Sequence, residues 1–320
     1  MTRPLNVLSL FDGISAAHTA LHLLGLPVTY FASEIDPDCL AVARKRYPNS
    51  YHLGDVCSLD PAFFGASPID LLLGGSPCQN LTKASAGDRS GVHGNKSRLF
   101  FEFVRLKESL QPRYWLLENV ASMSPKDRET ISQYLGAQPR LLDAGALSAQ
   151  SRKRLYWTNL PARPAPTPVD AVNLASVLEP RVPEKYYVAP ALEQVYRLLQ
   201  PGQNWRHLPA DHPEKLRIIA TRRKHADPGG MTGFWRVWDT QAKSPAVTAS
   251  GIRQRMTRFV LRDPVTQRHR YPTPLECERL QGLPPGLTSG LPTDDRRYRV
   301  IGNSFSVPSI CHLLWPLTQT

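Results

Sequence analysis

Residues 71 to 80 read Leu71-Leu72-Leu73-Gly74-Gly75-Ser76-Pro77-Cys78-Gln79-Asn80, a short apolar run that enters a tight turn and reaches a thiol. The pattern recurs where Tyr114-Trp115-Leu116-Leu117 leads into Glu118-Asn119-Val120. Apolar runs that end in turn residues are typical of strands buried on both faces of a parallel sheet. Because ligands gather at the carboxyl ends of such strands, we expect Cys78 and Glu118 at one edge of one sheet. A thiol and a carboxyl group together suit covalent attack on an electron-poor ring.

The first 160 residues alternate strand and helix patterns, which predicts a doubly wound, mostly parallel α/β sheet with a second, smaller irregular domain. Strands are expected at 6–11, 28–33, 69–73, 114–117, 140–142 and 155–158, and helices at 14–24, 36–47 and 97–110. A proline-rich stretch at 161–168 indicates an extended linker. We therefore expect domains at 1–160 and 161–244, and a segment at 245–320 that returns to the first domain.

The composition is that of a globular protein, with 41% apolar and 21% charged residues. No stretch approaches the roughly 18 apolar residues of a membrane span, and the first residues lack signal-peptide anatomy. The five cysteines include no CxxC pair, which argues against a disulfide framework or a metal site and favours a reducing compartment.

Positive charge is concentrated in the second half of the chain, which has a net charge of +12 overall. Residues 181–225 hold nine Lys and Arg against four Asp and Glu, and residues 251–300 hold ten Arg against five acidic residues. A solvated surface is the alternative, but an imbalance of this size favours a polyanionic partner, namely nucleic acid.

Three successive strand ends predict an adenosine pocket. A glycine and a helix start at the first joint suit close approach of a ligand, and an acid after the second strand suits a ribose. A third strand is expected to end at Gly54-Asp55-Val56, where an acid suits an adenine amino group. Helix capping is the alternative for either acid. The residues concerned are Phe11, Asp12, Gly13, Ile14 and Ser15, then Glu34 and Ile35, then Asp55 and Val56.

With these residues, the chain resembles the cytosine-5 DNA methyltransferases, which use S-adenosylmethionine, over about residues 6–160 and 245–315. In motif detail, residues 8–14 and 98–103 most resemble the vertebrate de novo enzymes. Ser15 departs from the second glycine of many members, although a small side chain still permits close approach. The matching motifs are Phe11-Asp12-Gly13, Pro77-Cys78-Gln79, Glu118-Asn119-Val120, Gln150-Ser151-Arg152-Lys153-Arg154, Thr273 to Gly282, and Gly302-Asn303-Ser304.

The resemblance implies a Rossmann-like catalytic and cofactor-binding domain, a target-recognition domain at 161–244 and a supporting segment at 245–320. It also implies that the Cys78 thiolate adds to carbon 6 of cytosine, after which carbon 5 accepts the methyl group. Glu118 would protonate ring nitrogen 3, which requires burial to favour its protonated form. Arg154 and Arg152 would hold the base carbonyl oxygen. Pro77, Asn303 and Ser304 would complete the cofactor pocket.

Duplex DNA is the expected partner, and the target cytosine must rotate out of the stack to reach the thiol. We expect residues 80–96 to close over the flipped base, with a plain surface loop as the alternative. Residues 161–244 should read the target sequence, which their spacing does not reveal. The predicted DNA-binding residues are Gln79, Asn80, Ser85, Arg89, Arg222, Arg223, Lys224 and Arg236.

We further expect a monomer in the cytoplasm of a prokaryotic or phage-infected cell, without membrane association. A cognate restriction endonuclease is the expected partner in a restriction-modification system, which the sequence does not distinguish from a solitary or phage-borne enzyme. One alternative is a tRNA cytosine-5 methyltransferase, but Asn80-Leu81-Thr82 differs from the second proline and Phe-Thr of that branch. The other is an inactive DNA-binding regulator, which the complete set of motif residues disfavours.

Overall fold

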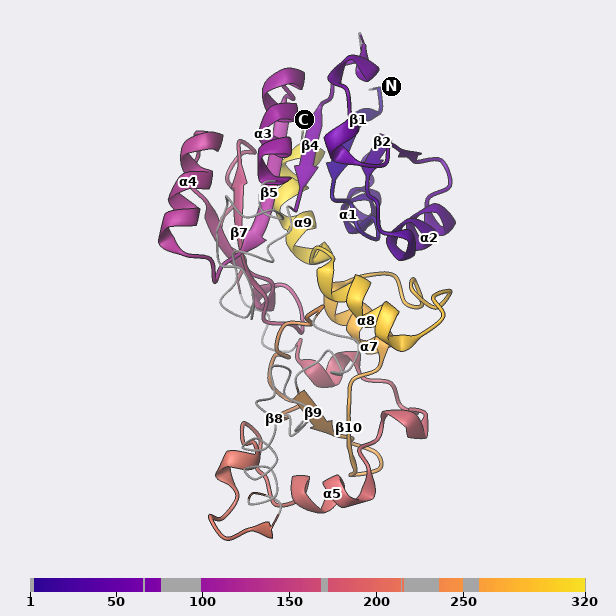
Figure 1. Cartoon of the computed structure of the whole chain (residues 1–320), viewed down its shortest axis with the longest axis vertical. Coiled ribbons are helices and arrows are strands. Elements are labelled where there is room, and N and C mark those ends of the chain that lie inside the picture. Colours follow the sequence, from indigo (N-terminus) through magenta and orange to yellow (C-terminus); the bar gives the residue numbers. More distant parts are fainter. Residues whose placement is uncertain are drawn as a thin grey trace. The chain divides into compact units, whose positions relative to one another are not determined.

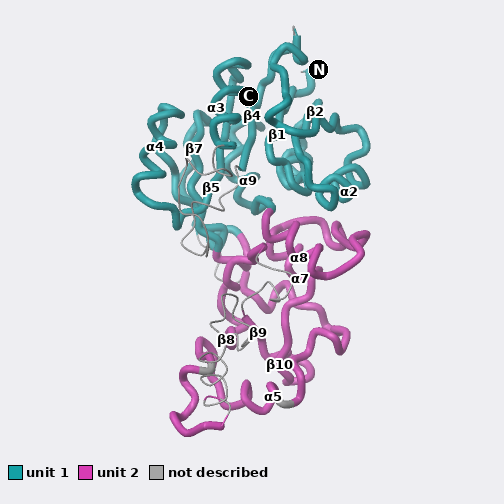
Figure 2. Tube along the Cα trace, in the orientation of Figure 1, with its two compact units in different colours: residues 1–147, 152–167, 304–320 teal, residues 148–151, 168–303 magenta. Residues whose placement is uncertain are grey.

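The computed structural model describes residues 3–65, 67–75, 99–167, 172–213, 215, 236–249 and 259–319. The chain forms two compact units (Figure 2). Unit 1 comprises residues 1–147, 152–167 and 304–320, and unit 2 comprises residues 148–151 and 168–303. The predicted division into 1–160, 161–244 and 245–320 concerns the roles of these segments and stays a prediction.

Unit 1 is built on a seven-stranded sheet of order β3-β2-β1-β4-β5-β7-β6. Strands β1 to β5 run parallel to one another, whereas β7 is antiparallel to both β5 and β6. The predicted α/β, mostly parallel fold is therefore confirmed. The strands are β1 (Leu5–Leu10), β2 (Val28–Ser33), β3 (Tyr51–His52), β4 (Leu71–Gly74), β5 (Tyr114–Val120), β6 (Arg140–Asp143) and β7 (Lys153–Thr158).

The strand order reverses between β1 and β4. The chain runs outward from β1 to β3 and then returns to place β4 on the other side of β1. Leu10 and Gly74, the last residues of β1 and β4, are paired in register. The segments that follow these two strands therefore start side by side at the switch point, which is where doubly wound sheets bind ligands.

Helices cover both faces of this sheet (Figure 1). On one face, α3 and α4 close a core that includes Leu8, Leu72, Phe100 and Trp157. On the other, α1 stacks His18 on Tyr30 of β2 and packs against α9. The helices are α1 (Ala16–Leu23), α2 (Pro37–Arg46), α3 (Leu99–Leu110), α4 (Pro125–Leu135) and α9 (Val307–Leu314), with 3-10 turns at Val56–Ser58, Pro61–Phe64, Ala144–Ala146 and Trp315–Gln319.

Unit 2, which includes most of the segment 161–244 that the sequence predicts to be irregular, contains a small sheet of order β10-β9-β8. Its core joins that sheet to α5 through Val195, Tyr196, Val237 and Val260. The Thr273 and Glu276 side chains form a capping box that fixes the start of α7. The elements are α5 (Pro190–Tyr196), β8 (Arg236–Trp238), β9 (Phe259–Arg262), β10 (His269–Arg270), α7 (Pro274–Gln281) and α8 (Asp294–Asn303), with 3-10 turns at Leu174–Val177, Glu184–Tyr186 and Trp205–His207.

One boundary differs from the sequence-based expectation in a way that matters for the site. The apolar run predicts that strand β5 ends at Leu117, but the strand continues through Glu118 to Val120. The antiparallel pairing with β7 supplies hydrogen bonds that extend the strand past its apolar run. Glu118 therefore lies within a strand and not on a turn.

In the part of the chain that the structure describes, none of the helices is both long and apolar enough to cross a membrane.

Candidate active site

The segment after β1 is held in an unusual backbone conformation. Phe11, Gly13 and Ser15 all have positive φ angles, of 55°, 60° and 57°. The amide of Asp12 donates to the Ser33 carbonyl oxygen (3.1 Å), and the amide of Gly13 donates to Glu34 Oε2 (2.8 Å). A Cβ added at Gly13 would meet no atom within 4 Å, so this side of the loop is open. An open glycine in front of a helix start is suited to close approach of a ligand.

Glu34 is fixed at the end of β2 by three backbone amides. Besides Gly13, the amides of Ile35 and Asp36 donate to its Oε1, each at 2.8 Å. Ile35 beside it is 68% exposed, a large apolar side chain that faces solvent next to the open loop. Glu34, which is predicted to bind a ribose, and the exposed Ile35 thus lie next to the open loop that follows β1.

Asp55 and Val56 follow β3. The exposed Asp55 carboxylate accepts a hydrogen bond from the Cys57 amide (2.9 Å) and caps the 3-10 turn that Val56 begins. Val56 is buried in the core beneath α3. This is the capping role that the sequence offered as the alternative for Asp55, and its contact with an adenine stays a prediction.

Asp12 is the buried carboxylate of this region, with 5% of its surface exposed. Its Oδ1 accepts a hydrogen bond from the Tyr30 hydroxyl (2.6 Å), and its Oδ2 accepts one from Ser15 Oγ (2.5 Å). Burial raises the pKa of Asp12 to about 6, although the hydrogen bonds from Ser15 and Tyr30 oppose that rise. Tyr30 was not among the predicted site residues, because only the folded sheet brings its hydroxyl to Asp12.

Glu118 lies beside the end of β4. A Cβ added at Gly75 would be 2.7 Å from the Phe305 ring and 3.5 Å from Glu118 Oε2. Glu118 Oε1 is 2.7 Å from Arg154 Nε, and both side chains are largely buried. The carboxyl end of β4, the predicted acid and the predicted arginine therefore converge, with Phe305 as a further neighbour that the sequence pattern did not single out.

The Q-x-R-x-R motif is divided between the two units. Gln150, fully buried in unit 2, donates to the Leu280 carbonyl and to Gln281 Oε1 (2.9 Å each) and accepts from the Val247 amide (2.8 Å). In unit 1, Arg152 is 4% exposed and donates to the Ser304 carbonyl oxygen (3.0 Å).

The structure shows where the remaining predicted residues of the described part lie. Ile14 is fully buried and Ser304 is 5% exposed, whereas Asn303, the last residue of α8, is exposed. Arg236 is exposed at the start of β8. Outside the described residues lie Pro77, Cys78, Gln79, Asn80, Ser85, Arg89, Arg222, Arg223 and Lys224.

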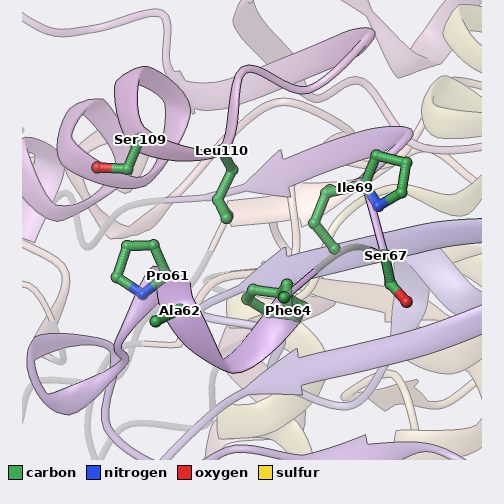
Figure 3. A pocket seen from close by; sticks show the side chains of 9 residues that line it. Pro61, Ala62, Phe64, Ser67, Ile69, Ser109 and Leu110 are labelled. Atoms are coloured by element: carbon green, nitrogen blue, oxygen red, sulfur yellow. The ribbon is translucent and has the colours of Figure 1, made fainter.

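A hollow of about 420 Å³ lies elsewhere on unit 1, between η2 (Pro61–Phe64) and the end of α3 (Figure 3). Phe64, Ile69 and Leu110 line it, together with Ser67 and Ser109. Ile69 precedes the first residue of β4, so this hollow lies near the amino end of that strand. It is therefore separate from the strand ends that carry Glu118 and the open loop.

Comparison with known proteins gives a consistent assignment. A family model described as C-5 cytosine-specific DNA methylase matches residues 5–316. The type II methyltransferase M1.ScrFI of Lactococcus lactis subsp. cremoris is 25% identical over 328 residues, covering 97% of this chain and 77% of the relative. The orphan methyltransferase M.Rho11sI of Bacillus phage rho11s is 35% identical over 127 residues, covering 39% of this chain and 24% of the relative.

The solved structure of the Entamoeba histolytica methyltransferase EhMeth has the same fold, with a TM-score of 0.71 at 15% identity and 99% of both chains covered. The expected closeness to vertebrate de novo enzymes is corrected, because M1.ScrFI and M.Rho11sI come from a bacterium and a phage. The family model matches nearly the whole chain. The position of Glu118 and Arg154 beside the end of β4 is consistent with that match. The chain belongs to the C-5 cytosine-specific DNA methylase family.

Proposed function

We propose that this enzyme transfers a methyl group from S-adenosylmethionine to carbon 5 of a cytosine that has rotated out of a specific duplex DNA sequence. The observation that carries the proposal is the position of Glu118, paired with Arg154 and 3.5 Å from a Cβ added at Gly75. Cys78 follows Gly75 by three residues. Glu118 and Arg154 thus lie beside the carboxyl end of β4, and the candidate nucleophile follows that end in the sequence. Strand β4 pairs with β1, which leads into the open loop.

The residues after β1 and β2 fit the proposed cofactor. The open side of Gly13 leaves room for a ligand, and the Glu34 carboxylate could accept hydrogen bonds from a ribose. The exposed Ile35 side chain offers apolar contact to an adenine ring. When bound, S-adenosylmethionine supplies an electrophilic methyl group. We propose that Phe11 to Ser15, Glu34, Ile35, Asp55, Val56, Pro77, Asn303 and Ser304 hold it.

The side chains have complementary tasks on the base. The Cys78 thiolate adds to ring carbon 6, which makes carbon 5 nucleophilic. Glu118 donates a proton to ring nitrogen 3 and so neutralises charge that develops on the ring. Arg154 lies against Glu118 and can donate to the base carbonyl oxygen, while Arg152 is bound to Ser304 in this structure. When carbon 5 loses its proton, the bond to Cys78 breaks and the thiolate is released.

The experiment is covalent trapping. Duplex DNA with 5-fluorocytosine at the target should form a stable adduct with the wild-type enzyme and cofactor, because fluorine cannot leave carbon 5 as a cation. Cys78→Ser should abolish both the adduct and turnover, whereas Cys57→Ser, at an exposed cysteine of unit 1, should leave them intact. Trapping that survives Cys78→Ser would exclude this thiol as the nucleophile.

The target sequence and biological setting also need an assay. We propose that residues 161–244 read the target, with Arg236 and the basic residues Arg222, Arg223 and Lys224 as candidate contacts. The relatives include a type II methyltransferase and an orphan methyltransferase, so a restriction-modification system and a solitary enzyme both have precedents among them. Bisulfite sequencing of plasmid DNA from cells that express the protein should reveal methylated cytosines in one sequence context. Salt-resistant transfer to tRNA, without transfer to duplex DNA, would favour the RNA-modifying alternative.

A further inference from the structure

A buried cluster of oxygen atoms underlies the open loop after β1. The Tyr30 hydroxyl from β2 and the Ser15 hydroxyl at the start of α1 each donate to one oxygen of Asp12, at 2.6 and 2.5 Å. Tyr30 and Ser15 are 2% and 0% exposed. Through this one carboxylate, a strand and a helix are both fastened to the middle of the loop.

The loop conformation needs such fastening. Phe11 and Ser15 have φ angles of 55° and 57°, a left-handed region that costs free energy for any residue with a Cβ. Ser15 is the N-cap residue of α1, but its side chain accepts no hydrogen bond from the first turn of that helix. Its hydroxyl group donates to Asp12 instead. The strained backbone persists because contacts around it determine its geometry, and the two hydroxyl bonds to Asp12 are buried contacts of this kind.

Tyr30 is itself held rigidly. Its ring stacks on His18 (centroids 4.2 Å apart), which stacks in turn on Tyr47 (3.9 Å). The Tyr47 hydroxyl pairs with Thr19 Oγ1 (2.9 Å), and Ser50 Oγ lies 3.2 Å from His18 Nδ1. The Tyr30 hydroxyl is thus aimed at Asp12 by a stack that spans α1 and the end of α2.

The charges around Asp12 make the hydroxyl bonds necessary. Burial favours the protonated carboxyl group and raises the pKa of Asp12 to about 6, and the negative charge of Glu34 acts in the same direction. The hydroxyl groups of Ser15, Tyr30 and Ser9 oppose the rise. His18 faces Tyr30 from α1, and burial lowers the pKa of His18 to about 4, so it stays neutral near pH 7.

We propose that Tyr30 is a positioning residue, which sets the S-adenosylmethionine-binding conformation of residues 11–15 through its hydrogen bond to Asp12; this inference rests on the proposed function. Tyr30 itself does not touch the ligand. It keeps Asp12 ionised and holds residues 11–15 in their strained conformation before the ligand binds. The free energy of ligand binding is then not spent on ordering this loop.

The test compares two tyrosine-to-phenylalanine variants of the full chain by calorimetric titration with S-adenosylhomocysteine. Tyr30→Phe keeps the stacked ring and removes only the hydroxyl, and we expect affinity to fall about tenfold near pH 7, the scale for a hydrogen bond to a charged group. Tyr47→Phe is the matched control, since its hydroxyl bonds to Thr19 and not to Asp12. Its affinity should stay within about twofold of wild type.

The pH dependence separates positioning from packing. Protonation removes the charge that strengthens both bonds and makes one Asp12 oxygen a donor, so that the two hydroxyl groups can no longer both donate to the carboxylate. Affinity should therefore decrease as pH falls through the pKa of Asp12. Tyr30→Phe removes a group that lowers this pKa, so the midpoint should move to higher pH. A merely structural role would lower the melting temperature without moving the midpoint. If Tyr30→Phe does not fold, Ser15→Ala removes the other hydroxyl donor, and the same upward shift is expected.

Three outcomes would overturn the inference. Tyr30→Phe could bind as tightly as wild type across the pH range, or both tyrosine variants could weaken binding equally, which would indicate general packing. If the wild-type protein itself fails to bind S-adenosylhomocysteine, the cofactor assignment of the proposed function fails first, and with it this inference.

Discussion

Glu118 and Arg154 meet because β5 and β7 are antiparallel neighbours. Glu118 pairs with Tyr156 and Val120 pairs with Arg154 in register, so the two charged residues lie two rungs apart in the ladder and their side chains point to the same face of the sheet. Their contact at 2.7 Å satisfies two groups that are largely removed from water. The pair therefore holds an acid at a fixed place beside Gly75, before any base is bound.

At this residue scale, Glu118→Gln keeps the size of the side chain and removes the acid. Turnover should fall by about 10²- to 10⁴-fold, the range for loss of a general acid, while affinity for S-adenosylhomocysteine changes little. Single-turnover methyl transfer and calorimetry measure the two effects. Glu108→Gln, in the last turn of α3, is the control and should leave both unchanged. Turnover within a few fold of wild type in Glu118→Gln would assign the acid to another group.

At the scale of elements, α8 packs closely against the backbone of Thr248 and Ala249 at Gly302. A Cβ at this position would lie 2.4 Å from the carbonyl carbon of Thr248 and 2.6 Å from the amide nitrogen of Ala249. Backbone atoms cannot rotate away as a flexible side chain does. The packing of α8 in unit 2 therefore depends on the absence of a side chain at a single helical position.

Gly302→Ala should lower the free energy of unfolding by about 1–3 kcal/mol, the usual cost of overpacking. Helix propensity alone would favour alanine by up to about 1 kcal/mol, so the two effects differ in sign. Urea denaturation monitored by circular dichroism distinguishes them. Arg296→Ala, at an exposed position of the same helix, should change stability by less than about 0.5 kcal/mol. A stabilised Gly302→Ala protein would contradict the close approach.

Local patterns predict some elements well and others poorly, for physical reasons. Strand β2 has the predicted bounds, and Asp36 caps α2 as expected, because both signals lie in neighbouring residues. Strand β5 is longer than predicted, since pairing with β7 overrides the low strand propensity of Glu118 and Asn119. The pattern does not reveal Tyr30 and Phe305, because their contacts join segments far apart in the chain.

At the scale of the whole molecule, net charge overstates the number of cations available to DNA. Arg270 is fully buried and bound by Asp263 and Glu276. Arg268 pairs with Glu184, and Arg297 lies 3.5 Å from Glu278. Several of the arginines that make residues 251–300 resemble a polyanion-binding surface therefore hold unit 2 together, and the charge argument for DNA is weaker than the count suggests.

Exchange of residues 161–244 for the corresponding segment of another family member should test where the target is read. We expect the methylated sequence to change to that of the donor, because this segment carries none of the catalytic motifs, while trapping by 5-fluorocytosine through Cys78 persists. Bisulfite sequencing and trapping assays on the same hybrid give both results. An active hybrid that still methylates the original sequence would place recognition elsewhere, in residues 80–96 or 248–258.

The return of residues 304–320 to unit 1 has a consequence for how the protein is synthesised. Helix α9 packs against α1, near the other end of the sequence, so unit 1 lacks α9 until unit 2 has been translated. The surface of α1 that α9 covers stays exposed during that time, which favours chaperone binding or aggregation. The order of translation thereby delays a complete unit 1 until unit 2 exists, and a ribosome that stalls within unit 2 releases no finished enzyme.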